Sequence, residues 1–441
     1  MYTCNIEFNI EKYNIQIGGG LYQYLNYECL LNLLKFGKND IEDNKFYIIT
    51  SLVSDEYVFL FLKVNQKFFI LVQKFSIDMV IDIESNKINI LSKISKEQVE
   101  NALNTLKMKI SFLYDNNIDF YKIFYIYNYE KLETSRKILF LNSYPRPWHY
   151  FQDFLCKFFI IKNKIMKDRV ISILSLVKNE YIDLNYDDIV TYEFISDDAA
   201  NQFIIENDFV VWRPIRNFIT KDECTFNMKE KFYFWLKNIS LKNSLEFRNS
   251  IIQEIIKYKY KIWISVARQG RKWIEQEQGI IELSESLRKM YGDEVCIVLD
   301  SLTSSLYYGK EAYGLINMDE IFYIHSLSKN LKIKSFNIFG FSSAEKINIA
   351  HCVDFYIGNM NTDMLYPCYI AKKHGVCYGS VENYDIKKQD EEILYLNFFP
   401  IEHVKTVNPR KIYCRSDYSI NPFYFAKYVS QQIYFYFTKN K

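Results

Sequence analysis

Three cations surround a glycine in the stretch "SVARQGRKW", residues 265–273, where Arg268, Arg271 and Lys272 flank Gly270. A cation at the start of a helix opposes the helix dipole, at a cost of about 0.3–1 kcal/mol each. Main-chain N–H groups at such a start bind anions. Three cations in this place therefore predict an anionic partner, and phosphate binding is one interpretation. Pairing of these cations with Glu275, Glu277 or a surface carboxylate is the other.

The elements on either side of this stretch give it a place in a fold. An apolar strand is predicted for residues 261–267, and a helical repeat of apolar residues follows it as far as Gly292. Open α/β sheets bind ligands at the carboxyl edge of their strands, so the cations are expected at a ligand-binding edge. The glycine patterns of a dinucleotide-binding loop and of a P-loop are absent.

A second group of candidates lies between residues 337 and 363. Ser342 and Glu345 fit the S-x-x-E capping box of a helix, "AEKINIAHC". A buried strand, "VDFYIGN", then leads into small and hydrogen-bonding residues. These residues suit contacts to a phosphate or a sugar hydroxyl, and an ordinary turn is the alternative. They are Gly358, Asn359, Asn361 and Thr362.

A third group lies in "NSYPRPWHYFQD", residues 142–153, where two prolines are expected to stiffen a loop after a strand. His149 is a candidate base toward a hydroxyl, and Trp148 or Tyr150 could stack on a sugar ring. Arg146 shares the loop. A lone histidine is more often structural, so both roles stay open for His149.

Further candidates are single residues. Arg213 and Arg216 follow a predicted strand in "VVWRPIRNF" and are candidates for substrate contact. His325, in "FYIHSLSKN", is a further candidate for the binding cleft. The remaining histidines show no metal-ligand spacing. No D-x-D motif occurs in the sequence, so we expect no metal site of that design.

Composition narrows the class of protein. The 441 residues carry 55 Lys+Arg and 53 Asp+Glu, a net charge of +2 that gives no overall field to attract nucleic acid. Nine scattered cysteines without a C-x-x-C pair indicate a reducing compartment. No signal peptide or apolar run of about 18 residues occurs. We expect a cytoplasmic protein, which could still contact a membrane surface or a protein partner. The sequence does not give its oligomeric state.

Apolar patterning divides the chain into three parts. Residues 1–130 are predicted to form a mixed α/β accessory module, with an N-terminal helix over 21–37, short antiparallel strands and a helix over 95–116. Strands alternate with helices in residues 131–245 and again, more clearly, in 246–441, with a final helix from 421 onward. This alternation is typical of parallel α/β sheets. Residues 320–327 are predicted to form one strand of the last part.

Two segments resemble a known group of enzymes. Residues 340–367, "GFSSAEKINIAHCVDFYIGNMNTDMLYP", and the R-P-x-H-x-F pattern of residues 146–151 are similar to segments of the glycosyltransferases with two Rossmann domains, known as GT-B. They look like family 61-type and related bacterial polysaccharide glycosyltransferases. The resemblance covers roughly residues 136–441. It implies two Rossmann-like domains, an acceptor-side domain over 131–245 and a donor-side domain over 246–441.

The resemblance also implies a reaction. A sugar would pass from a nucleotide-diphosphate donor, held by the second domain, to a hydroxyl of a bacterial glycan or glycoprotein. Arg268, Arg271 and Lys272 would offset the charge of the departing diphosphate, so no metal or other cofactor is expected. His149 would act as the base, with Asp153 or Glu345 in support.

One departure from the family keeps another function open. Residues 359–363 lack the histidine–glycine pair that family 61-type enzymes often carry, and the chain has only 13 glycines. The alternative is a non-catalytic glycan- or nucleotide-binding protein, or a scaffold, on a glycosyltransferase-like frame. A hydrolase that uses a cysteine as nucleophile is a third and less favoured interpretation.

Overall fold

In a computed structural model, the chain forms two compact units. Unit 1 comprises residues 1–144, 157–176 and 186–218, and unit 2 comprises residues 145–156, 177–185 and 219–441. The described residues are 46–50, 58–64, 67–73, 77–82, 87–90, 96–115, 125–126, 137–142, 147–165, 170–175, 181–184, 189–192, 203, 210–212, 223–243, 246–266, 272–303, 318–360, 362–387, 393, 395–408 and 416–439.

Unit 1 contains an antiparallel sheet with the strand order β5-β4-β3-β2-β1-β6. Consecutive apolar residues are buried in its central strands, Phe69 to Val72 in β3 and Met79 to Ile81 in β4. The strands are β1 (Phe46–Thr50), β2 (Val58–Val64), β3 (Lys67–Gln73), β4 (Ile77–Asp82), β5 (Lys87–Ile90) and β6 (Tyr125–Ile126). The antiparallel prediction for this part of the chain is confirmed.

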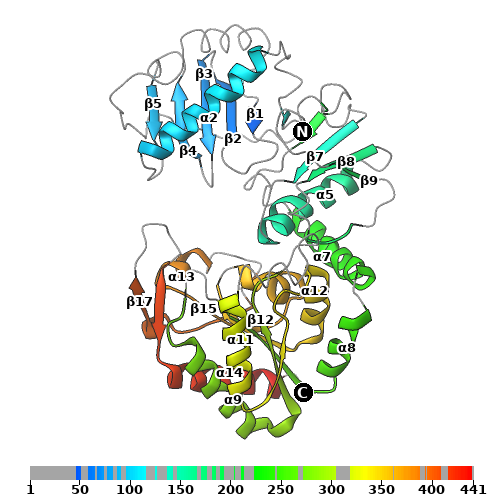
Figure 1. Cartoon of the computed structure of the whole chain (residues 1–441), viewed down its shortest axis with the longest axis vertical. Helices are drawn as coiled ribbons and strands as arrows, with labels where there is room; N and C mark the ends of the chain where they lie inside the picture. The colour runs from blue at the N-terminus through cyan, green and yellow to red at the C-terminus, as the bar shows by residue number, and fades with distance from the viewer. Residues whose placement is uncertain are drawn as a thin grey trace. The chain divides into compact units, whose positions relative to one another are not determined.

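Helix α2 (Lys96–Asp115) lies along this antiparallel sheet (Figure 1). Its buried residues Val99, Leu103 and Leu106 recur at gaps of four and three, so one stripe of the helix is apolar. The predicted helix over 95–116 is confirmed. The predicted helix over 21–37 lies outside the described residues.

A second sheet of unit 1 is parallel and has the strand order β10-β7-β8-β9. Its strands are β7 (Lys137–Asn142), β8 (Val170–Ser175), β9 (Ile189–Tyr192) and β10 (Val210–Trp212). Strands at the places of β7, β8 and β10, and parallel pairing, were predicted from the alternation of strands and helices, whereas β9 was not predicted. The predicted domain boundaries 1–130, 131–245 and 246–441 stay predictions.

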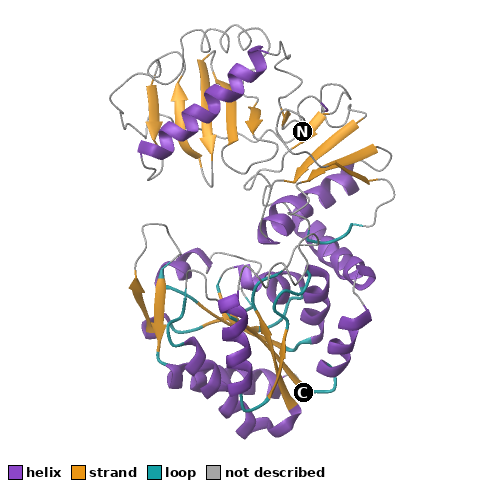
Figure 2. Ribbon diagram, in the orientation of Figure 1, coloured by secondary structure: helices purple, strands orange, loops and turns teal. Residues whose placement is uncertain are grey.

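Unit 2 is built on a six-stranded parallel sheet with the order β13-β12-β11-β14-β15-β16. Every residue of β12 is buried, and Trp263 in β11 is 0% exposed, because helices cover both faces of the sheet (Figure 2). The strands are β11 (Tyr260–Ser265), β12 (Val295–Asp300), β13 (Lys334–Asn337), β14 (Phe355–Asn359), β15 (Gly375–Tyr378) and β16 (Asn397–Phe398). This mixed α/β chain therefore contains a Rossmann-like parallel sheet.

Helices and a small antiparallel pair complete unit 2. The helices are α7 (Glu223–Asn243), α8 (Glu246–Ile255), α9 (Gln276–Tyr291), α11 (Met318–Asn330), α12 (Ser343–Cys352), α13 (Val381–Lys387) and α14 (Pro422–Lys439). Short 3-10 turns are η5 (Gly292–Glu294), η6 (Thr362–Met364) and η9 (Ile401–His403), and π-helical turns are η3 (His149–Leu155) and η7 (Leu365–Ile370). The antiparallel pair is β17 (Val404–Asn408) and β18 (Asp417–Ile420). Helix α5 (Cys156–Ile165) continues η3 and, apart from Cys156, belongs to unit 1.

Two element predictions are wrong. Residues 320–327 are helical, within α11, rather than a strand, because Glu320, Ile324 and Leu327 form a buried stripe at helical spacing. The helix after β11 begins at Gln276 instead of directly after the cations. Residues on both sides of Trp273 bond to Tyr418 of β18, which delays the start of the helix.

The predicted final helix is present as α14, and it packs against α9 and the sheet. Its Phe425 ring lies 4.4 Å from Trp273, and its Phe437 ring lies 4.7 Å from Tyr260. A Cβ atom at Gly279 of α9 would lie 2.0 Å from the Trp273 ring, so only glycine fits beneath that ring. None of the described helices has the length and apolar character needed to cross a membrane.

Acid is expected to destabilise unit 2 through His351, in the last turn of α12. Burial, with nearby Lys237 and Lys373, lowers the pKa of His351 from 6.5 to about 4. A depressed pKa means that the folded state disfavours the charged ring, so this stability is present above pH 6.5 and is lost as pH falls toward 4. After discounting for partial exposure, the loss should be about 1–2 kcal/mol.

The measurement is the free energy of unfolding between pH 7 and pH 4.5 for the natural chain and for His351→Gln. The variant should show a shallower fall of stability with acid. Equal slopes for the two proteins would contradict the assignment to His351.

Candidate functional site

The carboxyl edge of the six-stranded sheet contains a topological switch point. The chain runs from β11 outward through β12 to β13, and then returns to pair β14 with the other side of β11. In open α/β sheets, the connections that follow the two central strands leave in opposite directions and open a crevice, where ligands bind. The segments after β11 and β14 leave this switch point, and they carry two of the three groups of candidate residues.

Only one of the predicted cations lies among the described residues. Lys272 is half-buried, and its main-chain N–H donates to Asp417 Oδ1 at 2.9 Å. The Lys272 ammonium forms no ion pair with any residue that the structure describes. Arg268, Gly270 and Arg271 lie outside the described residues, so their anion-binding role stays a prediction.

Glu275, the alternative partner for the cations, is engaged elsewhere. Its carboxylate accepts from Ser419 Oγ at 2.6 Å and from Trp273 Nε1 at 3.1 Å. Glu275 thereby joins the start of α9 to β18. The Ser419 and Trp273 bonds, rather than a bond to Lys272, are the ones that occupy this carboxylate.

The residues after β14 divide between packing and exposed positions. A Cβ atom at Gly358 would lie 2.2 Å from the Tyr356 hydroxyl, so Gly358 admits the buried tyrosine. Asn359 is 0% exposed, and its amide donates to the Tyr418 hydroxyl at 2.9 Å. Thr362 is exposed at the start of η6. Asn361 lies outside the described residues.

The predicted capping box of α12 is present. Ser342 Oγ donates to Glu345 Oε2 at 2.6 Å, and the Ser342 and Glu345 main-chain N–H groups complete the reciprocal pair. Glu345 is 2% exposed. These bonds account for both side chains structurally, and a donor-binding role for them stays a prediction.

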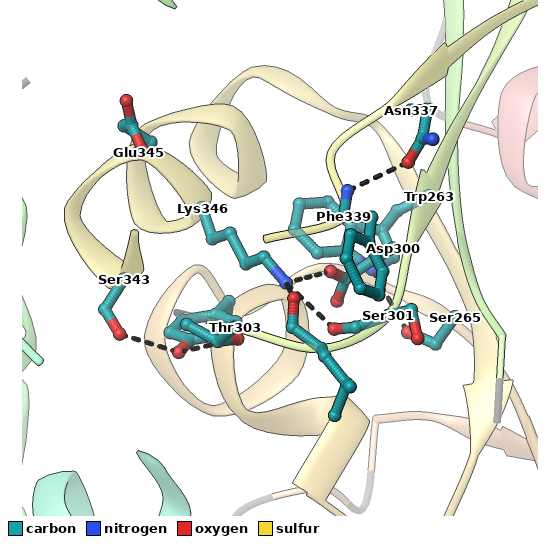
Figure 3. Close-up of polar contacts among 12 residues, drawn as sticks. Trp263, Ser265, Asp300, Ser301, Thr303, Asn337, Phe339, Ser343, Glu345 and Lys346 are labelled. Carbon is teal, nitrogen blue, oxygen red and sulfur yellow. Dashed lines mark hydrogen bonds and ion pairs between the residues drawn. The ribbon is translucent and has the colours of Figure 1, made fainter. Parts of the chain in front are cut away.

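A buried ion pair lies beneath the carboxyl edge, and the sequence did not reveal it. Lys346 of α12 is 0% exposed, and its Nζ lies 2.5 Å from Asp300 Oδ1 at the end of β12 (Figure 3). Burial raises the pKa of the Asp300 carboxyl, and the Lys346 ammonium opposes that rise. Two features of the sequence could have indicated this ion pair: Lys346 is the one lysine of α12, and Asp300 ends an otherwise apolar strand.

A hydroxyl network adjoins this ion pair. The Tyr366 hydroxyl donates to Thr303 Oγ1 at 3.3 Å and lies 2.8 Å from Ser343 Oγ. Ser301 Oγ donates to the Glu320 carboxylate of α11. The segment 301–303 that follows β12 is therefore tied to α11, α12 and η7.

The third predicted group lies in unit 2, on a helical turn. The predicted loop over 142–153 ends earlier than expected, since residues from Pro147 onward are helical. Proline suits the first turn of a helix, which explains why the helix begins there. His149 begins the π-helical turn η3 and is half-buried. The Trp148 ring lies 4.7 Å from Tyr369 of η7, nearly perpendicular to it. Turns of this rare kind often occur at functional sites.

Other residues of this group have different surroundings. Tyr150 is 2% exposed, its hydroxyl donates to the Ile182 carbonyl at 3.4 Å, and its ring contacts Tyr181. That environment is typical of a core residue, and its acceptor-binding role stays a prediction. Asp153 lies within η3, and its supporting role stays a prediction. Arg146 lies outside the described residues.

The remaining candidates are dispersed or undescribed. His325 lies at an exposed position in the middle of α11. Arg213 and Arg216 follow β10 outside the described residues. In the described part of the chain, no group of three or more His, Cys, Asp or Glu side chains is placed to hold a metal ion.

Comparisons with known proteins give weak structural neighbours. No protein-family model matches the chain, and no curated protein matches it. A glycosyl transferase family 9 structure from Veillonella parvula is 11% identical, with a TM-score of 0.38, and covers 69% of this chain and 96% of its own. A UDP-GlcNAc 2-epimerase structure from Methanocaldococcus jannaschii is 10% identical, with a TM-score of 0.30, and covers 78% of this chain and 84% of its own. At these TM-scores neither likeness carries an argument about function, and neither structure is described as a family 61-type enzyme.

Proposed function

We propose that the chain is a glycosyltransferase of the GT-B type, which moves a sugar from a nucleotide-diphosphate donor to a hydroxyl of a bacterial glycan or glycoprotein. One observation supports this most. The switch point of the Rossmann-like sheet lies between β11 and β14, and the segment after β11 carries Arg268, Arg271 and Lys272. A crevice at a switch point with a cluster of cations suits a diphosphate.

The cations have a specific task in this proposal. When the bond between the sugar's anomeric carbon and the diphosphate breaks, the electron pair stays on the diphosphate, which gains negative charge. Arg268, Arg271 and Lys272 stabilise that charge, as a divalent metal does in other enzymes. The proposed reaction therefore needs no metal and no other cofactor.

His149 is the proposed base. Its imidazole takes the proton of the acceptor hydroxyl as that oxygen attacks the anomeric carbon, with Asp153 or Glu345 in support. Among described residues, Trp148 and His149 belong to the same compact unit as the six-stranded sheet, and Trp148 contacts η7 of the connection after β14. That placement supports a base near the carboxyl edge of the six-stranded sheet, where the donor is proposed to bind.

The other proposed contacts are divided between the sugar donor and the acceptor. Proposed donor contacts are Gly270, His325, Ser342, Glu345, Gly358, Asn359, Asn361 and Thr362, and proposed acceptor contacts are Arg146, Trp148, Tyr150, Arg213 and Arg216. We propose a cytoplasmic location, no nucleic-acid partner, and a membrane surface or a protein as the place where the acceptor is presented. Thr362, which is exposed after β14, is the best placed of the described donor contacts.

A transfer assay tests the proposed function. The protein is incubated with radiolabelled UDP-sugars or GDP-sugars and a bacterial glycan fraction, and the sugar incorporated into the glycan is measured. We expect incorporation that persists when divalent metals are chelated. Binding of nucleoside diphosphate without incorporation from any donor would instead favour a non-catalytic binding protein.

A further inference from the structure

The main chain just after β12 is held by an unusually placed lysine. The Lys346 ammonium, which is fully buried, contacts Asp300 Oδ1 at 2.5 Å, the Ser301 carbonyl at 2.8 Å and the Leu302 carbonyl at 2.9 Å. Its charge is compensated by the Asp300 carboxylate. Two of its three bonds therefore fix backbone rather than side chains.

Further bonds fix the same segment. The Leu302 carbonyl also accepts from the Gly340 N–H at 2.9 Å, and the Asp300 carbonyl accepts from the Val266 N–H at 2.8 Å. Thr303 is bound through its hydroxyl by Tyr366. With donors on successive carbonyls, the peptide planes on both sides of Leu302 have little freedom to rotate.

The orientation of these planes determines where the N–H groups lie. In a trans peptide, the C=O of one residue and the N–H of the next point in opposite directions. Because the Ser301 and Leu302 carbonyls face Lys346, the N–H groups of Leu302 and Thr303 face away from it. Neither N–H has a protein acceptor in the described part of the chain, and both residues are half-buried. A main-chain donor in such a position needs water or a ligand as its partner.

The segment also lies beside the switch point. β12 is the hydrogen-bonded neighbour of β11, and adjacent strands are about 4.8 Å apart. Both strands end at the carboxyl edge, where Ser265 pairs with Asp300 in register. The free N–H groups therefore belong to the same edge as the predicted diphosphate site.

We propose that the main-chain N–H groups of Leu302 and Thr303 donate hydrogen bonds to phosphate oxygens, and that Lys346 is a positioning residue that orients them without touching the ligand. The identity of the ligand as a diphosphate rests on the proposed function. Successive main-chain N–H groups are established donors to phosphate. Lys346 serves this purpose through its bonds to the carbonyls, because its charge is already paired with Asp300.

The test uses the whole chain labelled with [15N]leucine and [15N]threonine. Leu302→Ile and Thr303→Ser identify the two amide resonances, and inorganic pyrophosphate is the probe. On titration, both amide protons should shift downfield with one common affinity, as expected for new N–H bonds to an anion. This shift reports on the two N–H groups themselves, and the role of Lys346 is tested separately with variants.

A pair of variants tests the positioning role. Lys346→Met should weaken pyrophosphate binding about tenfold or more, since misdirected N–H groups lose bonds to a charged acceptor. The control, Lys257→Met, removes an exposed ion pair with Glu254 and should leave the affinity unchanged. If Lys346→Met does not fold, the titration of the natural chain still decides whether the Leu302 and Thr303 N–H groups bind phosphate.

The outcomes separate this inference from the proposed function. Pyrophosphate that shifts other amides and leaves those of Leu302 and Thr303 unmoved would overturn the inference, and the diphosphate site near Arg268 would stand. If no resonance moves at any pyrophosphate concentration, the inference and the proposed diphosphate site are both wrong.

Discussion

Replacing Lys346 with methionine is expected to lower the free energy of unfolding of unit 2 by about 3–5 kcal/mol. The variant keeps most of the side-chain volume and removes the ammonium. Asp300, which is 3% exposed, would then remain buried without its cationic partner. The carbonyls of Ser301 and Leu302 would lose a donor as well, and unpaired buried acceptors are costly. Hydrogen exchange of the β12 amides, followed against urea concentration, measures the change.

Two comparisons make this prediction specific. Lys257→Met removes an ion pair whose side chains are 63% and 55% exposed, so the cost should stay within about 0.5 kcal/mol. The double variant Asp300→Leu with Lys346→Met should recover part of the stability, because no uncompensated charge remains. A loss below about 1 kcal/mol for Lys346→Met alone would show that the pair is not an essential link between β12 and α12.

Removing Arg268 and Arg271 together should reduce sugar transfer by about 10²- to 10⁴-fold. Each hydrogen bond to a charged group contributes about 1.5–3 kcal/mol, and a single charge-stabilising donor can change a rate by 10²–10³. The expected loss appears in kcat as well as in KM, because the diphosphate gains charge as it departs. The double variant Arg268→Ala with Arg271→Ala is compared with the natural chain in the transfer assay.

A matched control is available in α9, the helix that follows these cations in the sequence. Arg288 lies in the last turn of α9, at an exposed position, and donates to the Lys332 carbonyl at 3.0 Å. Arg288→Ala removes one cation from the same connection and should leave transfer unchanged. If the double variant transfers sugar at the natural rate, the assignment of Arg268 and Arg271 to the diphosphate site is wrong.

The order of strands and helices could be predicted where their patterns are local. β11, β12 and β14 are short apolar runs, and α12 begins with a capping box that can be recognised from its S-x-x-E motif. The helix α11 was missed because its aromatic and β-branched residues resemble those of a strand. Its acidic first turn, Asp319 and Glu320, was the signal that favoured a helix.

The site was harder to predict, because its contacts join residues far apart in the sequence. The delayed start of α9 depends on bonds between the residues around Trp273 and Tyr418, in β18. The pairing of Lys346 with Asp300 likewise depends on the order of strands in the sheet, which the sequence does not show. Sequence reasoning could place the cations after β11 and had no means to find the lysine that fixes the backbone beside them.

The central claim is that a diphosphate binds at the carboxyl edge of the six-stranded sheet, between the ends of β11 and β14. A crystal of the protein soaked with UDP or GDP tests it most directly. The account predicts a bound diphosphate within hydrogen-bonding distance of the segment 268–272 and of the Leu302 and Thr303 N–H groups. A nucleotide bound away from this edge, or no bound nucleotide at saturating concentration, would contradict the account.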